Sequence, residues 1–147
     1  MPTYVSRRAP GSPALSSREV RRIADRMLAE LGLPDAELSV LFTDDGRMTK
    51  LNERHRNKPR PTDVLAFPQD GVSGGGSNGP HLLGDVVISL DTAARQAKSR
   101  GRPLLDEVRF LLAHGVAHLL GHDHQTAAEK REMDRVTRRL VRAGKRA

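Results

Sequence analysis

Cysteine is absent from this chain of 147 residues. The absence excludes a disulfide framework and leaves no thiolate to act as a nucleophile or as a metal ligand. Any metal site must therefore use histidine and carboxylate side chains. Aromatic residues are also scarce: Tyr4, Phe42, Phe67 and Phe110 are the only four, and the three phenylalanines fall in apolar runs. The usual platform of exposed aromatic rings for stacking nucleic-acid bases is therefore poorly supported.

Long apolar stretches are missing too. Residues 1–17 lack the apolar core of a signal peptide, and no segment approaches the length needed to span a bilayer. We therefore expect a cytoplasmic protein with no membrane partner. The length of 147 residues suits one ordinary domain with a single core, so a second domain is not needed.

Basic residues outnumber acidic ones, with 25 Lys and Arg against 18 Asp and Glu, a net charge of +7. Such an excess favours a polyanionic partner such as nucleic acid. Many basic proteins bind no nucleic acid, however, so the charge alone leaves both interpretations open. The basic run within residues 126–145 is equally open, because it suits a solvated helix face or a set of sequence-independent phosphate contacts.

The spacing of apolar residues predicts the order of helices and strands. A capping sequence at Ser16 precedes the first helical pattern, and Gly32 ends it. The expected helices cover 17–31, a short segment around 48–51, 91–100, 104–120 and 126–145, and the expected strands cover 38–43, 64–67 and 82–89. This order predicts an α+β fold, a single domain in which a small mixed β-sheet packs with helices, one of them the histidine helix.

Two segments are expected to lie outside the regular structure. Residues 1–15 are rich in Pro, Ser and Arg, which predicts a flexible basic N-terminal arm before a domain over 16–147. Residues 71–80 include three consecutive glycines. No helix follows them directly, as a phosphate-binding loop would require, so we interpret this segment as a flexible surface loop.

The helix expected over 104–120 carries His114 and His118, which are four residues apart. This spacing puts both side chains on one helix face, roughly 5–6 Å apart at Cβ, so both imidazoles can reach one cation. Gly121 follows where a left-handed glycine cap reverses the chain, and His124 comes three residues later. Neutral imidazole is the usual zinc ligand, and three such ligands leave the fourth tetrahedral position to water, as in catalytic sites.

Other interpretations of these residues stay open. A histidine pair at this spacing also arises by chance, and a lone buried histidine is more often a hydrogen-bonded core residue. His122 could be a spare ligand, a partner of a ligand or a turn residue, and Asp123 could orient an imidazole or bond its own backbone. A metallopeptidase helix would carry glutamate directly after the first histidine, where this chain has Gly115.

The run from His114 to His124, HGVAHLLGHDH, resembles the H-G-x-x-H-L-x-G-x-D-H signature of the YbeY family. Residues 56–68, RNKPRPTDVLAFP, resemble the family's R-x-x-x-x-x-T-D-V-L-S-F-P stretch, and residues 84–89, GDVVIS, resemble its G-D-I-x-I-S strand. Together the motifs cover roughly residues 20–140. Ala66 replaces a frequent serine, His122 stands where the family often has tyrosine, and the glycine-rich loop is long. His122 leaves open which imidazole completes the site.

The resemblance implies a bacterial single-strand endoribonuclease that assists ribosomal RNA maturation and ribosome quality control. It implies one zinc ion bound by His114, His118 and His124, and a catalytic role for Arg56. A guanidinium suits that role because it can clamp phosphate oxygens and stabilise developing charge. Judged without the resemblance, Arg56 is equally a solvated loop arginine.

Four further polar residues are expected to be structural or exposed. Asp63 and Asp85 are interpreted as aspartates that tie loops to backbone or orient site residues, with no part in proton transfer. His55 and His81 are interpreted as exposed loop residues, because neither has a metal-ligand partner at regular spacing.

The leading hypothesis is a zinc-dependent single-strand endoribonuclease acting in 16S ribosomal RNA 3′-end maturation and ribosome quality control. Its expected partners are ribosomal RNA and the ribosome or ribosomal proteins, with no DNA. The alternative, which the basic charge fits equally well, is a non-catalytic RNA-binding assembly factor of the ribosome with a structural metal. Metal-dependent cleavage of single-stranded RNA separates the two.

Overall fold

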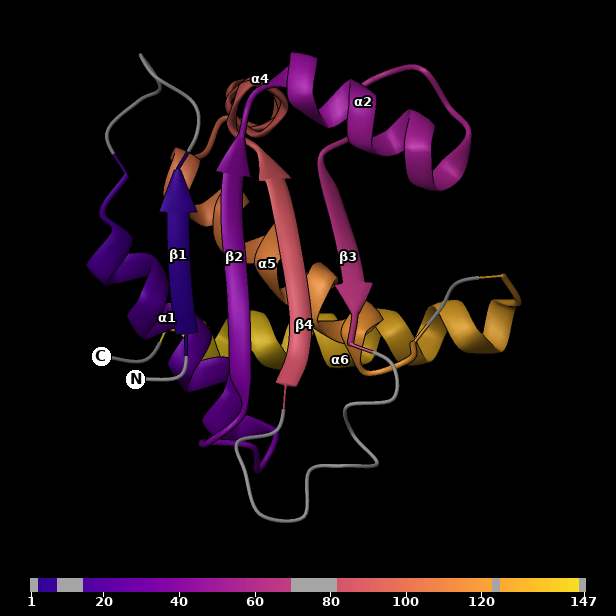
Figure 1. Ribbon diagram of the computed structural model, residues 1–147. Coiled ribbons are helices and arrows are strands. Elements are labelled where there is room, and N and C mark those ends of the chain that lie inside the picture. Colours follow the sequence, from indigo (N-terminus) through magenta and orange to yellow (C-terminus); the bar gives the residue numbers. More distant parts are fainter. Residues whose placement is uncertain (1–2, 8–14, 70–81, 123–124, 146–147) are drawn as a thin grey trace.

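The computed structural model describes residues 3–7, 15–69, 82–122 and 125–145, and all structural statements concern these ranges. The strands are β1 (Thr3–Arg7), β2 (Glu37–Thr43), β3 (Val64–Pro68) and β4 (Leu82–Ser89). The helices are α1 (Ser17–Glu30), α2 (Asp45–Arg56), α4 (Leu90–Arg100), α5 (Leu104–Leu119) and α6 (Ala127–Lys145). Helices α1, α5 and α6 lie behind the sheet, and α2 lies across its upper end (Figure 1).

The sheet is mixed, with the strand order β1-β2-β4-β3. Strands β1, β2 and β4 run parallel, with Val40 of β2 between Val5 and Val86. Strand β3 runs antiparallel to β4 and pairs Leu65 with Val87. The α+β class and the small mixed sheet are thus confirmed.

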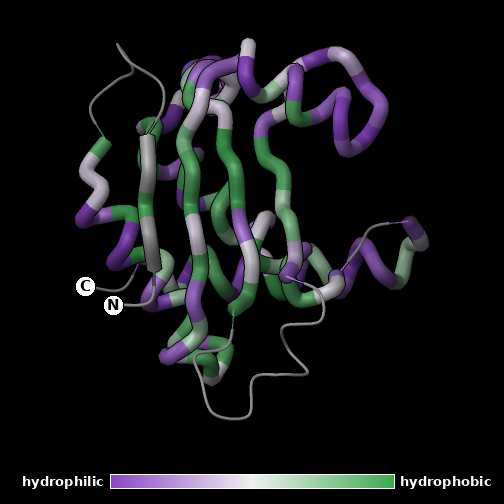
Figure 2. Tube along the Cα trace, in the orientation of Figure 1, coloured by the Kyte–Doolittle hydropathy of each residue, from purple (hydrophilic) through white to green (hydrophobic). Residues whose placement is uncertain are grey.

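The two faces of the sheet are covered unequally. Val40 and Phe42 of β2 are buried in the main core, which α1, α5 and α6 complete. A smaller cluster of Met48, Leu65 and Val87 lies on the opposite face, where α2 covers it. Figure 2 shows the hydrophobic colour along the central strands and the hydrophilic colour over much of α2 and α6. Helix α5 lies between the sheet and α6, which explains why its sequence is apolar on most sides.

Helix α6 is held against α1 by polar contacts as well as by apolar packing. Arg139 donates from Nε to the Glu30 carboxylate at 2.7 Å and from Nη2 to the Glu30 carbonyl at 2.9 Å. Arg26 donates to the carbonyl of Gly144 at 3.1 Å. These contacts orient α6 across the back of the molecule. No helix in the described ranges combines the length and the apolar character that a membrane crossing requires.

The N-terminal segment differs from the expectation. We predicted a flexible arm over residues 1–15, but Thr3–Arg7 form β1, the edge strand that pairs with β2. The prediction is therefore wrong for these five residues, while residues 1–2 and 8–14 lie outside the described ranges. Ser16 caps α1 as predicted, because its Oγ accepts the N–H of Glu19 at 3.2 Å. The loop predicted over 71–80 also lies outside the described ranges.

Candidate functional site

The site is organised by the contact of α5 with the sheet. A Cβ placed on Gly115 would lie 2.7 Å and 3.1 Å from the two Cγ atoms of Val86 and 3.3 Å from a Cγ of Val64. Helix α5 therefore approaches β4 and β3 more closely than any side chain at position 115 would allow. A glutamate here would have no room, which gives a steric reason for the absence of the metallopeptidase base.

His114 and His118 flank Gly115 and are both half-buried. Their rings lie with centroids 5.0 Å apart and planes at 81° to each other. The structure thus brings the two predicted imidazoles together on one helix face. Phe110, one turn earlier, stacks on His114 with a centroid distance of 6.1 Å and an interplanar angle of 25°. The two histidine rings lie near the surface on a helix that is otherwise mostly buried, and the packing of that helix limits how far either ring can move.

The chain reverses directly after the histidines. Gly121 adopts φ 95°, and its N–H donates to the carbonyl of His118 at 2.9 Å. The N–H of His122 donates to the carbonyl of Ala117 at 3.2 Å. These two bonds form a Schellman motif, so the predicted left-handed glycine cap is confirmed. The motif brings the backbone of His122 back beside the last turn of α5.

The third proposed ligand, His124, and its neighbour Asp123 lie outside the described ranges. Within those ranges, no three His, Asp or Glu side chains gather closely enough to hold a metal ion. The structure therefore brings together two of the three proposed ligands. His122, the other candidate, is half-buried.

Arg56 is the last residue of α2, and its side chain is exposed. It forms no ion pair with any described residue. Asn57 then takes φ 58°, and buried Asn52 donates from Nδ2 to the carbonyl of Arg60 at 2.8 Å. The left-handed Asn57 and this hydrogen bond turn the basic loop after α2 back toward the helix, and Arg56 and Lys58 are exposed. Helix α2 packs against α4 and β4, so Arg56 lies on a different element from the histidines.

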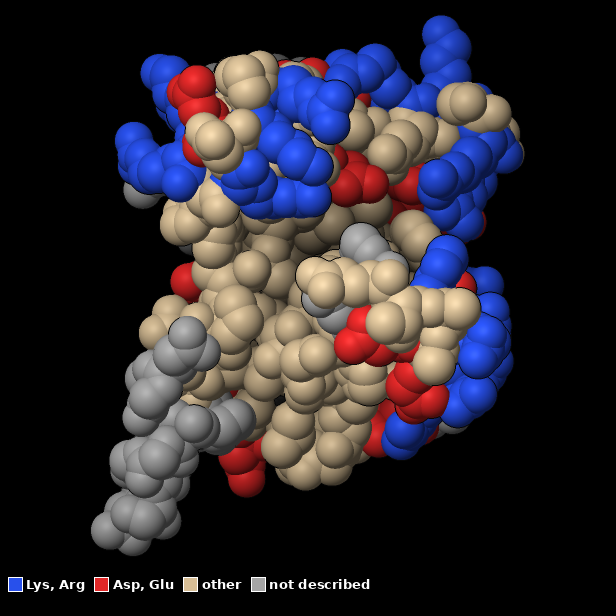
Figure 3. Space-filling model, turned by 90° about the vertical axis from the view of Figure 1, so that its right-hand side faces the viewer, with Lys and Arg blue, Asp and Glu red and all other residues tan. Residues whose placement is uncertain are grey.

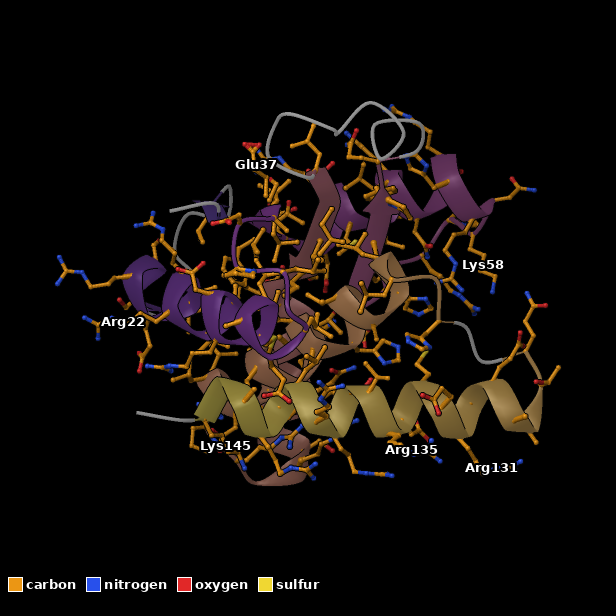
Figure 4. All side chains as sticks on the ribbon, turned by 90° about the horizontal axis from the view of Figure 1, so that it is seen from below. Arg22, Glu37, Lys58, Arg131, Arg135 and Lys145 are labelled. Atoms are coloured by element: carbon orange, nitrogen blue, oxygen red, sulfur yellow. The ribbon has the colours of Figure 1, made fainter. Side chains whose placement is uncertain are left out.

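Basic side chains border the end of the molecule that carries this site. Figure 3 shows Lys and Arg gathered along the upper part of this face, over α2 and its loop, and along the lower right edge, over α6, with a hollow between them. Figure 4 places Lys58, Arg131 and Arg135 at the same end of the molecule, and Arg22 and Lys145 at the other. Asp and Glu side chains lie among the basic ones close to the hollow, so its border carries both signs of charge with Lys and Arg farther out (Figure 3).

The aspartates next to the site differ in their surroundings. Asp63 accepts the N–H of Val64 at 2.7 Å and the amide of Gln96 at 3.2 Å, which ties the start of β3 to α4. This contact set agrees with the structural role predicted for Asp63. Asp85 is half-buried and lies 3.5 Å from the side-chain amide of Gln69, which is at the limit of a hydrogen bond.

The two remaining histidines are placed differently from the prediction or not at all. His55 is exposed as expected, but it belongs to the last turn of α2 and not to a loop. Its ring lies 4.5 Å from that of Phe67. His81 lies outside the described ranges.

Asp45, at the start of α2, joins three elements. It accepts hydrogen bonds from Ser89 and Thr92 at 2.7 Å and from Arg95 at 2.8 Å. Burial raises the pKa of Asp45, but the three hydrogen bonds and the charge of Arg95 outweigh it, and the net pKa is lowered. Asp45 therefore stays ionised and holds α2 over the end of the sheet.

Glu107 is a residue whose importance the sequence analysis missed. Its side chain is fully buried near the start of α5 and accepts from Arg100 at 2.7 Å and from Arg102 at 2.9 Å. Both guanidinium groups also lie over the Phe110 ring, at 5.8 Å and 5.7 Å from its centroid. The signal was a single carboxylate in an otherwise apolar helix face, which requires a partner when it is buried.

A family model described as Endoribonuclease YbeY matches residues 11–144. A relative of that name from Anaeromyxobacter dehalogenans is 48% identical over 130 residues, 88% of this chain and 65% of the relative. Another from Aquifex aeolicus is 46% identical over 112 residues, 76% of this chain and 72% of the relative. The chain thus spans just under two thirds of the first relative's length.

The solution structure of a Thermotoga maritima protein has a related fold. It matches with a TM-score of 0.65 and 19% sequence identity, and the match covers 97% of this chain and 88% of the other. At this identity the likeness concerns the arrangement of helices and strands alone.

Proposed function

The chain belongs to the endoribonuclease YbeY family, and on that premise we propose that it is a metal-dependent endoribonuclease that cleaves single-stranded RNA. The observation that carries the proposal is the pair of imidazoles on α5, 5.0 Å apart, directly before a glycine turn that reverses the chain. This arrangement offers two nitrogen ligands to a metal ion, and the net charge of +7 favours a polyanionic substrate.

The proposed metal is a single zinc ion bound by His114, His118 and His124. The donor chemistry fits, because imidazole nitrogen is a preferred zinc ligand and the two described rings share a helix face. The Schellman motif at Gly121 brings the backbone of His122 beside the last turn of α5. Bound zinc supplies Lewis-acid polarisation of a phosphodiester oxygen and lowers the pKa of a bound water.

The residues of the chain itself bind and orient the substrate. Arg56 is the proposed catalytic arginine, because its guanidinium is exposed, has no ion-pair partner among the described residues and can donate two parallel hydrogen bonds to phosphate. There it offsets negative charge that develops on the phosphate oxygens. Lys58, Arg131 and Arg135, which lie at one end of the molecule, would hold the flanking phosphates.

We propose that the biological substrate is ribosomal RNA, with a role in 16S 3′-end maturation and ribosome quality control in the cytoplasm. The ribosome or its proteins would be the partners. Support comes from the motif resemblance and from the net charge of +7, which favours association with a ribonucleoprotein.

The proposal is tested by incubating the purified chain with a labelled single-stranded RNA, with and without zinc. We expect cleavage only with metal, and a rate at least about 100-fold lower in Arg56→Ala and in His114→Ala. Arg56→Lys should remain impaired, because it keeps the charge but loses the paired hydrogen bonds. Arg22→Gln, at the far end of the molecule, is the matched control. Equal cleavage by all variants, or by metal-free protein, overturns the proposal.

A non-catalytic assembly factor with a structural metal is the second candidate. It is favoured by the position of the imidazole pair directly before the turn, because a metal there would fasten the turn to α5. Binding of single-stranded RNA without turnover, together with a large loss of thermal stability on chelation, would favour this factor over the enzyme.

A further inference from the structure

A cavity of about 230 Å³ lies between α5 and α6, and none of the proposed metal ligands lines it. Its lining consists of one residue of α5 and four of α6: Phe110, Thr137, Arg138, Val141 and Arg142. Pockets that enclose a whole small molecule usually measure about 300–1,000 Å³. This cavity therefore suits one part of a longer ligand, with the remainder lying along the surface.

The lining combines an apolar wall with unpaired positive charge. Phe110 and Val141 are half-buried and supply the wall. Arg138 and Arg142 are exposed and form no ion pair with any described residue, whereas Arg139 on the same helix is paired with Glu30. Unpaired guanidinium groups at the border of an apolar cavity favour a ligand that joins an anionic group to a flat apolar group.

Thr137 adds a polar group that nothing in the described structure satisfies. Its side chain is 3% exposed, and its Oγ1 has no hydrogen-bond partner among the described residues. A buried hydroxyl without a partner is unfavourable, and the residue that carries it belongs to the lining of the cavity. A nucleobase edge offers both donors and acceptors to such a hydroxyl.

Phe110 connects this cavity to the histidines. Its ring stacks on His114 at 6.1 Å and also lines the cavity. A strand of RNA crossing the imidazole pair would therefore reach the cavity within about one helical turn of α5, roughly 5.4 Å along its axis.

We propose that the cavity is a nucleotide subsite, in which one base of single-stranded RNA packs against Phe110 and Val141 while Arg138 and Arg142 bind the adjoining phosphates. The subsite rests on the proposed RNA-cleaving function and adds to it a position where the enzyme holds a nucleotide next to the scissile bond. It also assigns phosphate binding to two residues of the basic run on α6, Arg138 and Arg142.

The first test measures the charge component. The variant Arg138→Gln/Arg142→Gln is compared with Arg22→Gln/Lys145→Gln, which removes the same charge at the other end of the molecule. Binding of a fluorescent single-stranded oligoribonucleotide is followed by anisotropy over a range of salt concentrations, with RNA integrity checked on gels. We expect the slope of log K against log salt to fall by about 1.4 in the first variant, for two lost phosphate contacts, and to stay at the wild-type value in the second. Equal slopes in the two variants overturn the proposal.

The second test measures the base component. Val141→Phe fills the cavity without changing charge, and a series of oligonucleotides carries an abasic nucleotide at each position in turn. We expect one position at which the abasic change weakens wild-type binding about 5- to 150-fold, and no such position in Val141→Phe. Thr137→Val, nearly isosteric, should change the preference among bases at that position and leave the salt slope unchanged.

The outcomes separate this proposal from the proposed function. In one outcome the wild-type protein cleaves RNA while the cavity variants bind RNA, and respond to abasic positions, as the wild type does. That result would overturn the subsite and would leave the proposed nuclease activity standing. If the binding results are as expected but no RNA is cleaved, the subsite proposal is supported and the proposed nuclease activity is refuted. Tight binding of a protein partner that Val141→Phe abolishes, with RNA binding unchanged, would assign the cavity to protein recognition and overturn the proposal.

Discussion

Gly115 stands where α5 packs tightly against β4 and β3, and its replacement by alanine tests how firmly that contact positions the two histidines. The new Cβ would lie 2.7 Å from one Cγ of Val86. Val86 is fully buried, and its β-branched side chain has little rotamer freedom. Either the valine or the whole helix must therefore move.

Two opposing effects set the magnitude. Alanine in a helix interior is more favourable than glycine by about 1 kcal/mol. Inserting a methyl group into a packed core costs about 1–3 kcal/mol, and the contact with a rigid valine puts Gly115→Ala in the upper part of that range. We therefore expect a net loss of about 1–2 kcal/mol in the free energy of unfolding.

The assay is urea denaturation followed by far-UV circular dichroism for Gly115→Ala, Val86→Ala and the double variant. Val86→Ala alone should lose about 2–3 kcal/mol, because two buried methyl groups are removed and a cavity remains. In the double variant the new methyl group occupies that space. Its loss of unfolding free energy should therefore be smaller than the sum of the two single losses by about 1 kcal/mol or more. RNA cleavage should follow the same pattern, since both histidines flank position 115. Additive losses, or a Gly115→Ala variant more stable than wild type, would refute the steric reasoning.

Three further predictions concern the sheet, pH and the metal. Gly84→Ala should lose about 2–5 kcal/mol in denaturation experiments, because φ is +142° and the new Cβ would lie 2.4 Å from the Phe67 carbonyl oxygen; a loss below about 1 kcal/mol would contradict this. The pKa of Asp45 is lower in the folded protein than its usual value of 3.8. Its carboxylate therefore stabilises the fold fully at pH values above 3.8, and this effect is lost as the pH falls through the pKa of the folded state. Asp45→Asn should therefore lower the free energy of unfolding by about 1–2 kcal/mol at neutral pH and by progressively less below pH 3.8. A loss of the same size at every pH would show that the ionised carboxylate is not its cause. Added zinc should stabilise chelator-treated protein by about 2.7 kcal/mol at a hundredfold excess over Kd, measured as a rise in Tm, and His114→Ala should abolish the response; an unchanged response would place the metal elsewhere.

Much of the site could be predicted because its signals are local. The spacing of His114 and His118 dictates a shared helix face, and Gly121 after the last apolar turn dictates a left-handed cap; the structure shows both. The position of Arg56 at a helix end was less predictable, because α2 carries few apolar residues and its ends depend on the caps Asp44 and Asn57. The third proposed ligand, His124, stays a prediction.

Local sequence patterns were enough to predict the order of the helices and of strands β2, β3 and β4, the caps at Ser16 and Gly121 and the imidazole pair, since each depends on interactions within a few neighbouring residues. The strand at Thr3–Arg7 could not be predicted in this way, because a short edge strand exists only where a distant partner, here β2, supplies its hydrogen bonds. Tertiary packing also decided that Gly115 touches Val86 and that Phe110 and Thr137 share a cavity. Contacts between elements far apart in the chain leave no periodic trace in either segment, so they become visible only when the elements meet.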